Sequence, residues 1–309
     1  MQNSLSILLC FLAMYLGVWL PTTAQIDSLT VLSWNVKMLP TFMEARSKTQ
    51  RAKAIVAQLK DSQADIVVLQ ELFYKKTRKL ITKELQAIYP YQTTVLNPRA
   101  VSLKSNGGVL IMSKHPFTQT AQHIRFSARK GIDRMARKGA MWVEIAYKGK
   151  KVQVVGTHLQ AWGTDSILYR QYRQIYEELL RPNEQKNVPQ LICGDFNTLK
   201  KLPDSLPPTI TPARVATMPR YAQLLTTLQA TDGDLLGKHQ FTMDRPHNDM
   251  CKKFKQSRIV LDYIFIRNHS PHICIERSVK VLRQQWHKAH QDLSDHYAVE
   301  GKLYWYAVP

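Results

Sequence analysis

The sequence predicts an α/β sandwich built on mixed β-sheets. Short apolar runs typical of strands alternate with segments of helical spacing, and a Lys148-Gly149-Lys150 turn joins two neighbouring strand candidates. Interleaved helices favour parallel pairing, whereas the turn requires an antiparallel hairpin, so both pairings are expected. With 309 residues and no repeat or low-complexity linker, residues 25–309 are predicted to form one domain.

The first 24 residues precede this domain and resemble a secretory signal. They carry no charge, and residues 5–20 are almost continuously apolar. This pattern predicts a signal peptide cleaved after Ala24, although the usual Lys or Arg near the start is absent. An uncleaved anchor is the alternative, since the run is short for a bilayer span.

Strand and helix candidates alternate through the first half of the chain. Residues 29–36 alternate apolar and polar side chains as a strand does, and residues 51–59 have helical spacing. Residues 64–71 are an apolar run that ends in an acid, Glu71. A second helix is expected over residues 76–88, and Tyr89-Pro90 is expected to end it. Four more strand candidates follow, at residues 91–96, 108–113, 140–146 and 152–159.

The second half repeats this alternation. Residues 166–180 have an apolar helical face, and residues 189–193 form the next strand candidate. Residues 198–220 are rich in proline and are expected to be an irregular surface segment over the site. A short helix at 221–228 and strands at 259–266 and 297–304 complete the prediction.

The cysteines argue against a disulfide framework. After removal of the signal, Cys193, Cys251 and Cys274 remain, an odd number. Cys193 lies within an apolar run and is expected to be a buried thiol. A bridge between Cys251 and Cys274 is left open.

The chain is strongly basic, with a formal net charge of +20. This exceeds what solubility requires and predicts an anionic partner. Nucleic acid phosphates and an anionic membrane surface both fit, and charge alone does not distinguish them. The basic residues gather in three stretches, at 75–79, 129–138 and 252–258.

Polar side chains occur at the ends of the strand candidates. They are Asn35, Glu71, His158, Asp195, Asn197, Asp262, Asp295 and His296. The set is rich in oxygen ligands and imidazoles and includes no nucleophile elbow, so it suits metal-assisted attack of water on a phosphate. Mg²⁺ needs only one or two carboxylates, which Glu71 assisted by Asn35 could provide. Asp262 could fix the tautomer of an imidazole, and His296 could then accept a proton from water.

Each of these residues also has an ordinary structural explanation. Glu71 could face solvent, and Asn35 could be a turn or cap residue. Asp195 and Asn197 could form a turn, and His158 could bond a backbone carbonyl. The coincidence of all the stretches in one chain is what favours a site.

In their order along residues 29–304, these motifs resemble the endonuclease/exonuclease/phosphatase superfamily. The marks are a strand ending in Asn35, the acid of Leu69-Gln70-Glu71, Thr157-His158, Gly194-Asp195-Phe196-Asn197, Leu261-Asp262-Tyr263 and Ser294-Asp295-His296. Three further segments, at 35–40, 107–116 and 156–161, are similar to the secreted bacterial neutral sphingomyelinases of the sphingomyelinase C type.

The resemblance implies a deoxyribonuclease-like fold, a four-layer α/β sandwich of two facing mixed sheets flanked by helices. It also implies a role for each site residue. Glu71 with Asn35 would hold Mg²⁺ or another divalent cation, and Asp295 would support the metal and water network. Asp195 with Asn197 would orient the attacking water and the phosphate. His158 would stabilise the phosphorane-like charge or assist the leaving alkoxide, and Asp262 would orient the base His296.

The function implied is that of a secreted or periplasmic Mg²⁺-dependent phosphodiesterase. It would hydrolyse sphingomyelin, or a related phospholipid at a membrane surface, to ceramide and phosphocholine, with no obligate protein partner. Two alternatives stay open: a secreted deoxyribonuclease-like endonuclease, which the charge would suit, and a non-catalytic module on the same fold that binds lipid or nucleic acid.

The chain departs from the resemblance at residues 268–293. Relatives that lyse cells have a long apolar β-hairpin here, whereas this segment is expected to be short and is basic, with Trp286 its only tryptophan. Trp162 and Trp286 are candidates for contact with a lipid interface, and Trp34, Trp142 and Trp305 are expected in the core.

Overall fold

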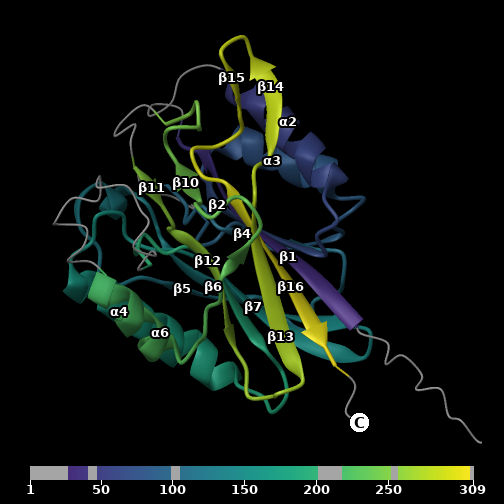
Figure 1. Cartoon of the computed structure of the whole chain (residues 1–309), viewed down its shortest axis with the longest axis vertical. Helices are drawn as coiled ribbons and strands as arrows, with labels where there is room; N and C mark the ends of the chain where they lie inside the picture. The colour runs from purple at the N-terminus through teal and green to yellow at the C-terminus, as the bar shows by residue number, and fades with distance from the viewer. Residues whose placement is uncertain (1–26, 41–46, 99–104, 201–217, 252–256, 307–309) are drawn as a thin grey trace, which may run out of the picture.

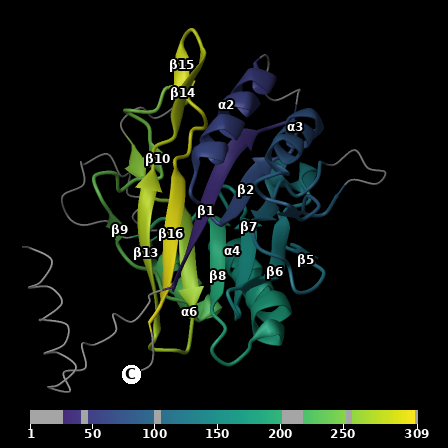
Figure 2. The ribbon, with the colours of Figure 1, turned by 90° about the vertical axis from the view of Figure 1, so that its right-hand side faces the viewer.

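The computed structural model describes residues 27–40, 47–98, 105–200, 218–251 and 257–306. In Figures 1 and 2, two β-sheets face each other, with α2 (Lys48–Asp61) and α3 (Lys75–Leu85) outside one sheet and α4 (Asp165–Ile175) and α6 (Met218–Leu228) outside the other. The predicted four-layer α/β sandwich is therefore confirmed.

The first sheet has seven strands and is mixed. Central strand β1 runs parallel to β2 and antiparallel to β16. In spatial order the strands are β3 (Tyr91–Gln92), β4 (Leu110–Ser113), β2 (Ile66–Leu72), β1 (Asp27–Met38), β16 (Ala298–Trp305), β13 (Ile273–Lys280) and β9 (Leu235–Leu236).

The second sheet has five strands and is also mixed. β7 and β8 pair in parallel, and the other neighbours are antiparallel. The strands are β12 (Asp262–Arg267), β8 (Gln190–Asp195), β7 (Lys150–His158), β6 (Gly139–Tyr147) and β5 (Gln122–Arg125). Lys148 and Gly149 both have positive φ, as a tight hairpin turn requires, and they join β6 to β7 as predicted.

Shorter elements complete the description. The π-helix Tyr176–Leu180 continues α4 and is followed by the 3₁₀ turn Arg181–Asn183; a further 3₁₀ segment, η1, spans Gly131–Met135. Two small two-stranded sheets are formed by β10 (Met243–Asp244) with β11 (Arg258–Ile259), and by β14 (Arg283–His287) with β15 (His290–Asp292).

The period-two pattern of β1 explains how the layers pack. Leu29 and Val31 point into the core between the two sheets, whereas Leu32 and Trp34 point to the opposite face, under α2 and α3. A third core lies between the second sheet and the helices α4 and α6. Apolar residues are therefore buried on both faces of β1, as expected for a central strand that is covered on both sides.

Most predicted elements are present, with shifted ends. The predicted strand 91–96 is regular only at Tyr91–Gln92, and the predicted strand 259–266 is interrupted between β11 and β12. The helix predicted over 166–180 changes to π geometry at Tyr176. The predicted signal, the basic run at 252–255 and most of the proline-rich segment 198–220 lie outside the described residues.

The structure corrects the interpretation of residues 268–293. The segment is not only a short connection, since it contains the eight-residue strand β13 of the first sheet and the hairpin β14–β15 that projects at the top of Figure 1. Trp286 is partly buried: its indole stacks on His290 and donates to the carbonyl of Asp292. Among the described residues, no helix is long and apolar enough to span a bilayer.

The tryptophan and cysteine predictions can also be checked. Trp34, Trp142 and Trp305 are buried as predicted, whereas Trp162 is exposed. Cys193 is a buried free thiol; Cys251 and Cys274 are also free, so the bridge between them is not formed.

Candidate active site

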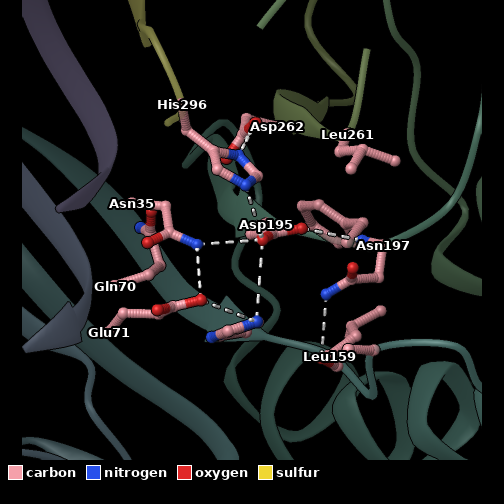
Figure 3. Close-up of polar contacts among 12 residues, drawn as sticks. Asn35, Gln70, Glu71, Leu159, Asp195, Asn197, Leu261, Asp262 and His296 are labelled. Atoms are coloured by element: carbon pink, nitrogen blue, oxygen red, sulfur yellow. Dashed lines mark hydrogen bonds and ion pairs between the residues drawn. The ribbon is translucent and has the colours of Figure 1, made fainter. Parts of the chain in front are cut away.

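The sheet registers bring the predicted site residues to one edge of the sandwich. In the first sheet Asn35 of β1 pairs with Gln70, next to Glu71. In the second sheet Asp195 of β8 lies between His158 of β7 and Asp262 of β12. The carboxyl ends of β1, β2, β7 and β8 therefore meet the amino ends of β12 and β16, which run the other way. Figure 3 shows the resulting cluster.

Asn35 links the two sheets through its side-chain amide. Its Nδ2 donates to Oε1 of Glu71 at 3.0 Å and to Oδ2 of Asp195 at 3.0 Å (Figure 3). Its Oδ1 accepts the backbone N–H of Lys37 at 3.1 Å. In this orientation the amide nitrogen of Asn35, not its oxygen, faces the two carboxylates. Asn35 therefore positions Glu71 and Asp195 and does not offer an oxygen ligand to a cation between them.

His296 and Asp262 form a buried hydrogen-bonded pair. Nδ1 of His296 lies 2.7 Å from Oδ2 of Asp262, and its Nε2 lies 3.9 Å from Oδ2 of Asp195. Burial disfavours the imidazolium, but Asp262, with help from Asp195 and Asp295, outweighs it and raises the pKa of His296 to about 10. The predicted orienting contact between Asp262 and an imidazole is thus present, and Nε2 is directed toward the other carboxylates.

The loop that presents His296 is fixed by contacts with β1. The Trp34 indole donates to the carbonyl of His296 at 2.9 Å, and the Ser294 hydroxyl donates to the carbonyl of Asn35 at 2.6 Å. Buried Arg51 of α2 donates to the carbonyls of Val36 and Leu293, at 2.8 and 2.6 Å. Arg51 was not predicted as a site residue, since sequence spacing shows only that it begins a helix.

His158 contacts a lysine that the sequence placed in a basic surface stretch. Nζ of Lys138 lies 3.1 Å from Nε2 of His158 and 2.9 Å from Oδ2 of Asp133. Burial, and then the charge of Lys138, hold the pKa of His158 well below its usual value. His158 is therefore neutral, and the positive charge beside it belongs to Lys138. No sequence feature distinguishes the buried Lys138 from the other residues of the basic stretch.

Asp295 and Asn197 occupy the two sides of the cluster. Asp295 forms an ion pair with Lys37, with a separation of 2.7 Å. Burial opposes ionisation, but His296 and Lys37 hold the pKa of Asp295 below its usual value. Asn197 donates its backbone N–H to Oδ1 of Asp195 at 2.9 Å, so the turn considered as an alternative from sequence exists inside the site. All eight predicted residues are thereby brought together.

The donor set fits a divalent cation. One ligand atom each from Glu71, His158 and Asp195 lie within 4.8 Å of one another. Burial, and then the charge of Asp262, raise the pKa of Asp195 to about 7, and burial with the charge of Asp295 raises that of Glu71. Burial and the neighbouring carboxylates thus disfavour the ionised forms of Asp195 and Glu71, and a bound cation would offset both effects.

The cluster lies at the floor of a cleft of about 1180 Å³. Glu71, Asp195 and His296 line its base. Its walls are largely apolar and include Leu39, Pro40, Phe73, Val95, Ile132, Met135, Trp162, Leu199, Met243 and Leu261. A charged centre below apolar walls suits a substrate with a phosphate and a hydrocarbon portion.

Comparison with known proteins agrees with this geometry. The family model for the endonuclease/exonuclease/phosphatase family matches residues 32–296. The chain belongs to this family. It is 29% identical over 303 residues to sphingomyelinase C 2 of Leptospira interrogans serovar Lai, a match that covers 89% of this chain and 46% of the relative. It is also 29% identical over 313 residues to a sphingomyelinase C of Bacillus cereus, with 91% of this chain and 90% of the relative covered. The chain spans about half the length of the Leptospira relatives it matches.

Solved structures show the same fold. Beta toxin from Staphylococcus aureus superposes with a TM-score of 0.77 at 25% identity, covering 88% of this chain and 99% of the toxin. Sphingomyelinase C from Streptomyces griseocarneus gives a TM-score of 0.76 at 25% identity, with 89% and 99% covered.

Proposed function

We propose that the protein is a Mg²⁺-dependent phosphodiesterase that hydrolyses sphingomyelin to ceramide and phosphocholine. The observation that supports this best is the His296–Asp262 pair, placed beside Glu71 and Asp195 at the floor of an apolar-walled cleft. The similarity to proteins named sphingomyelinase C supports the choice of lipid.

His296 is the proposed base. Its Nε2 and Oδ2 of Asp195 are 3.9 Å apart, too far for a direct hydrogen bond and suited to a bridging water. The positive charge of a bound cation would oppose the carboxylates that raise the pKa of His296 and would favour its neutral form. Neutral His296 would remove a proton from this water, whose oxygen bonds to phosphorus as the bond to the ceramide oxygen breaks and that oxygen takes up a proton. Asp262 keeps Nδ1 bonded, so the free Nε2 is the atom that exchanges the proton.

Glu71, with Asp195 and His158 nearby, would hold the cation. When bound, Mg²⁺ supplies Lewis-acid stabilisation of the phosphate and a positive charge that offsets the carboxylates. In this proposal Asn35 sets the distance between Glu71 and Asp195, and Asp295 adds negative charge near Glu71. Asn197 turns the chain at Asp195 and faces the cleft, where it can contact the phosphate.

Lys138 is added to the predicted set as the source of positive charge beside His158. Neutral His158 brings no positive charge, whereas Lys138 does and is held in place by Asp133 and by the carbonyl of Leu159. We assign to the Lys138–His158 pair the stabilisation of charge on the phosphate and leaving oxygen.

A panel assay tests the function. Headgroup release would be measured from sphingomyelin, phosphatidylcholine and phosphatidylinositol vesicles, with and without Mg²⁺, using His296→Ala as the inactive control. We expect Mg²⁺-dependent release of phosphocholine from sphingomyelin by the wild type alone. Release of another headgroup in preference, or undiminished activity of His296→Ala, would contradict the proposal.

A nuclease remains the second candidate, because the net charge of +20 suits a polyanion. The apolar cleft walls favour lipid over DNA, whose backbone offers them no hydrocarbon partner. Plasmid DNA would be included in the panel, and efficient nicking with intact sphingomyelin would favour the nuclease. If the wild type hydrolyses none of the phospholipids and does not nick DNA, a non-catalytic binding module is favoured.

We also propose that the protein is exported, on the basis of the uncharged apolar N-terminus. Amino-terminal sequencing of protein recovered from the medium or periplasm should begin at Gln25. Recovery of uncleaved protein from the cytoplasm alone would contradict export.

A further inference from the structure

Three exposed apolar side chains stand at the mouth of the cleft. Ile132 and Met135, on η1, are 66% and 50% exposed, and Trp162, just after β7, is 77% exposed. All three line the cleft that leads to His296. We call these three residues the apolar rim. Large apolar side chains gathered on a surface in this way are typical of a binding face.

The two segments of the apolar rim are joined by partly buried polar contacts. Gln160 accepts the backbone N–H of Lys130 at 2.9 Å and donates to its carbonyl at 3.1 Å. Oδ2 of Asp133 accepts the backbone N–H of Ala161 at 2.9 Å. Because the contacts fix both backbones, the rim is presented as one preformed surface.

Four arginines, here called the arginine cluster, lie close to one another, and one of them, Arg134, is on η1 with Ile132 and Met135 of the apolar rim. They are Arg125, Arg129, Arg134 and Arg137. Nε and Nη1 of Arg129 and Nε of Arg137 are buried without a hydrogen-bond partner. Within the described part of the chain, none of the four forms an ion pair with an acid. Burial, and then the neighbouring arginines, lower the pKa of Arg129, so their charges are close enough to repel one another. A cluster of this kind lacks its counter-anion.

The hairpin β14–β15 offers no equivalent surface. Its strands contain arginine, glutamine and histidine, and its one tryptophan packs inward beneath Arg51 of α2. If the protein acts on lipid in a bilayer, contact with that bilayer has to come from a surface other than this hairpin.

We propose that the apolar rim and the arginine cluster together dock the protein on an anionic lipid membrane. Ile132, Met135 and Trp162 enter the interfacial layer, and the arginines bind lipid phosphates around them. The orientation that results turns the cleft toward the bilayer. Nucleic acid is the less suitable partner, since its phosphates would satisfy the arginines but leave the aliphatic part of the rim in water. This proposal rests on the proposed lipid phosphodiesterase function, because docking would bring the cleft to its substrate. The test measures vesicle binding and does not require hydrolysis.

Vesicle binding in EDTA separates docking from hydrolysis. Sucrose-loaded vesicles of phosphatidylcholine, with or without phosphatidylglycerol, contain no sphingomyelin and would be sedimented with the protein. We expect binding to increase with phosphatidylglycerol and to weaken with salt. The paired substitution Arg129→Gln, Arg134→Gln should reduce affinity for anionic vesicles about 30-fold, from roughly 1 kcal/mol per basic residue.

Two further variants make the result specific. The control Arg181→Gln, Lys186→Gln removes the same charge from the region before β8, at the opposite end of that strand from Asp195, and should bind as the wild type does. Arg134→Gln alone changes an exposed side chain, so it provides a test even if the double variant does not fold. This single variant should lose about fivefold in affinity for anionic vesicles.

The apolar rim is tested by Trp162→Ala, which should weaken binding to neutral and anionic vesicles alike. Equal loss of affinity in the control pair, or unchanged binding in both arginine variants and Trp162→Ala, would overturn the proposal. Tighter binding of duplex DNA than of anionic vesicles, lost in the arginine pair, would assign the cluster to nucleic acid instead. If the vesicles bind as expected but sphingomyelin is not hydrolysed with Mg²⁺, docking stands and the proposed function fails.

Discussion

Replacing Asp262 with asparagine tests the assignment of His296 most directly. Asp262→Asn preserves the size of the side chain but removes the charge that lies 2.7 Å from Nδ1 of His296. In the wild type Asp262 is the main group that offsets burial and raises the pKa of His296 to about 10. Without it, burial should dominate and the pKa of the imidazole should fall.

The rate and its pH dependence should change together. We expect turnover of sphingomyelin to fall on the order of 10²–10⁴-fold, the range for a general acid–base group that loses its orientation. Because the pKa of the base falls, the acid limb of the pH–rate profile should move to lower pH. Nuclear magnetic resonance titration of His296 would report the same direction independently of turnover.

Stability gives a second readout with a defined sign. A His296 pKa of about 10 in the folded state lies above the ordinary value of 6.5, so the charged pair stabilises the fold fully below about pH 6.5. That stabilisation is lost as pH rises toward 10. Asp262→Asn should therefore lower the free energy of unfolding at pH 6 by more than at pH 10.

A matched control separates this effect from the general cost of losing an acid. Asp65 also contacts a histidine, with Oδ1 3.3 Å from Nε2 of His115, but it precedes the first residue of β2, at the end of the strand opposite Glu71. Asp65→Asn should leave the pH–rate profile unchanged. Turnover by Asp262→Asn within threefold of the wild type, or an acid limb that does not move, would refute the role given to Asp262.

Three further predictions follow from the structure. Glu71→Gln should weaken Mg²⁺ binding, measured by calorimetry, by at least the roughly 10–100-fold that outer-shell substitutions cost; unchanged affinity would remove Glu71 from the metal site. Arg51→Met leaves the buried carbonyls of Val36 and Leu293 unpaired, so chemical denaturation should show a loss on the order of 3 kcal/mol or more, together with reduced turnover. Glu144 is buried, which favours its neutral form, but hydrogen bonds led by that from Lys151 lower its pKa to about 2. Its stabilisation is present above about pH 4.5 and lost as pH falls toward 2, so Glu144→Gln should destabilise the protein at pH 7 and have little effect near pH 2.

Local sequence patterns predicted much of the fold. The apolar run of β2 follows from burial on both faces, β1 was recognised from its strand-like spacing, and the Lys148-Gly149 turn identifies the β6–β7 hairpin. Short edge strands were missed, since β9 and β10 have two residues each and no periodicity to detect. β13 was missed because only three of its eight residues are buried, and the basic character of the segment concealed them.

The sequence by itself determined which chemical groups are available: carboxylates and imidazoles at strand ends, and an excess of positive charge. It could not determine which groups meet. Asp195 meets Asp262 only through the pairing of β8 with β12, and Asn35 reaches Asp195 only because the two sheets pack face to face. Likewise Lys138 and Arg129 belong to one basic stretch, yet one is buried beside His158 and the other lies among exposed arginines. The physical reason is that charge is a property of the residue, whereas its partner and its burial depend on contacts between segments far apart in the chain.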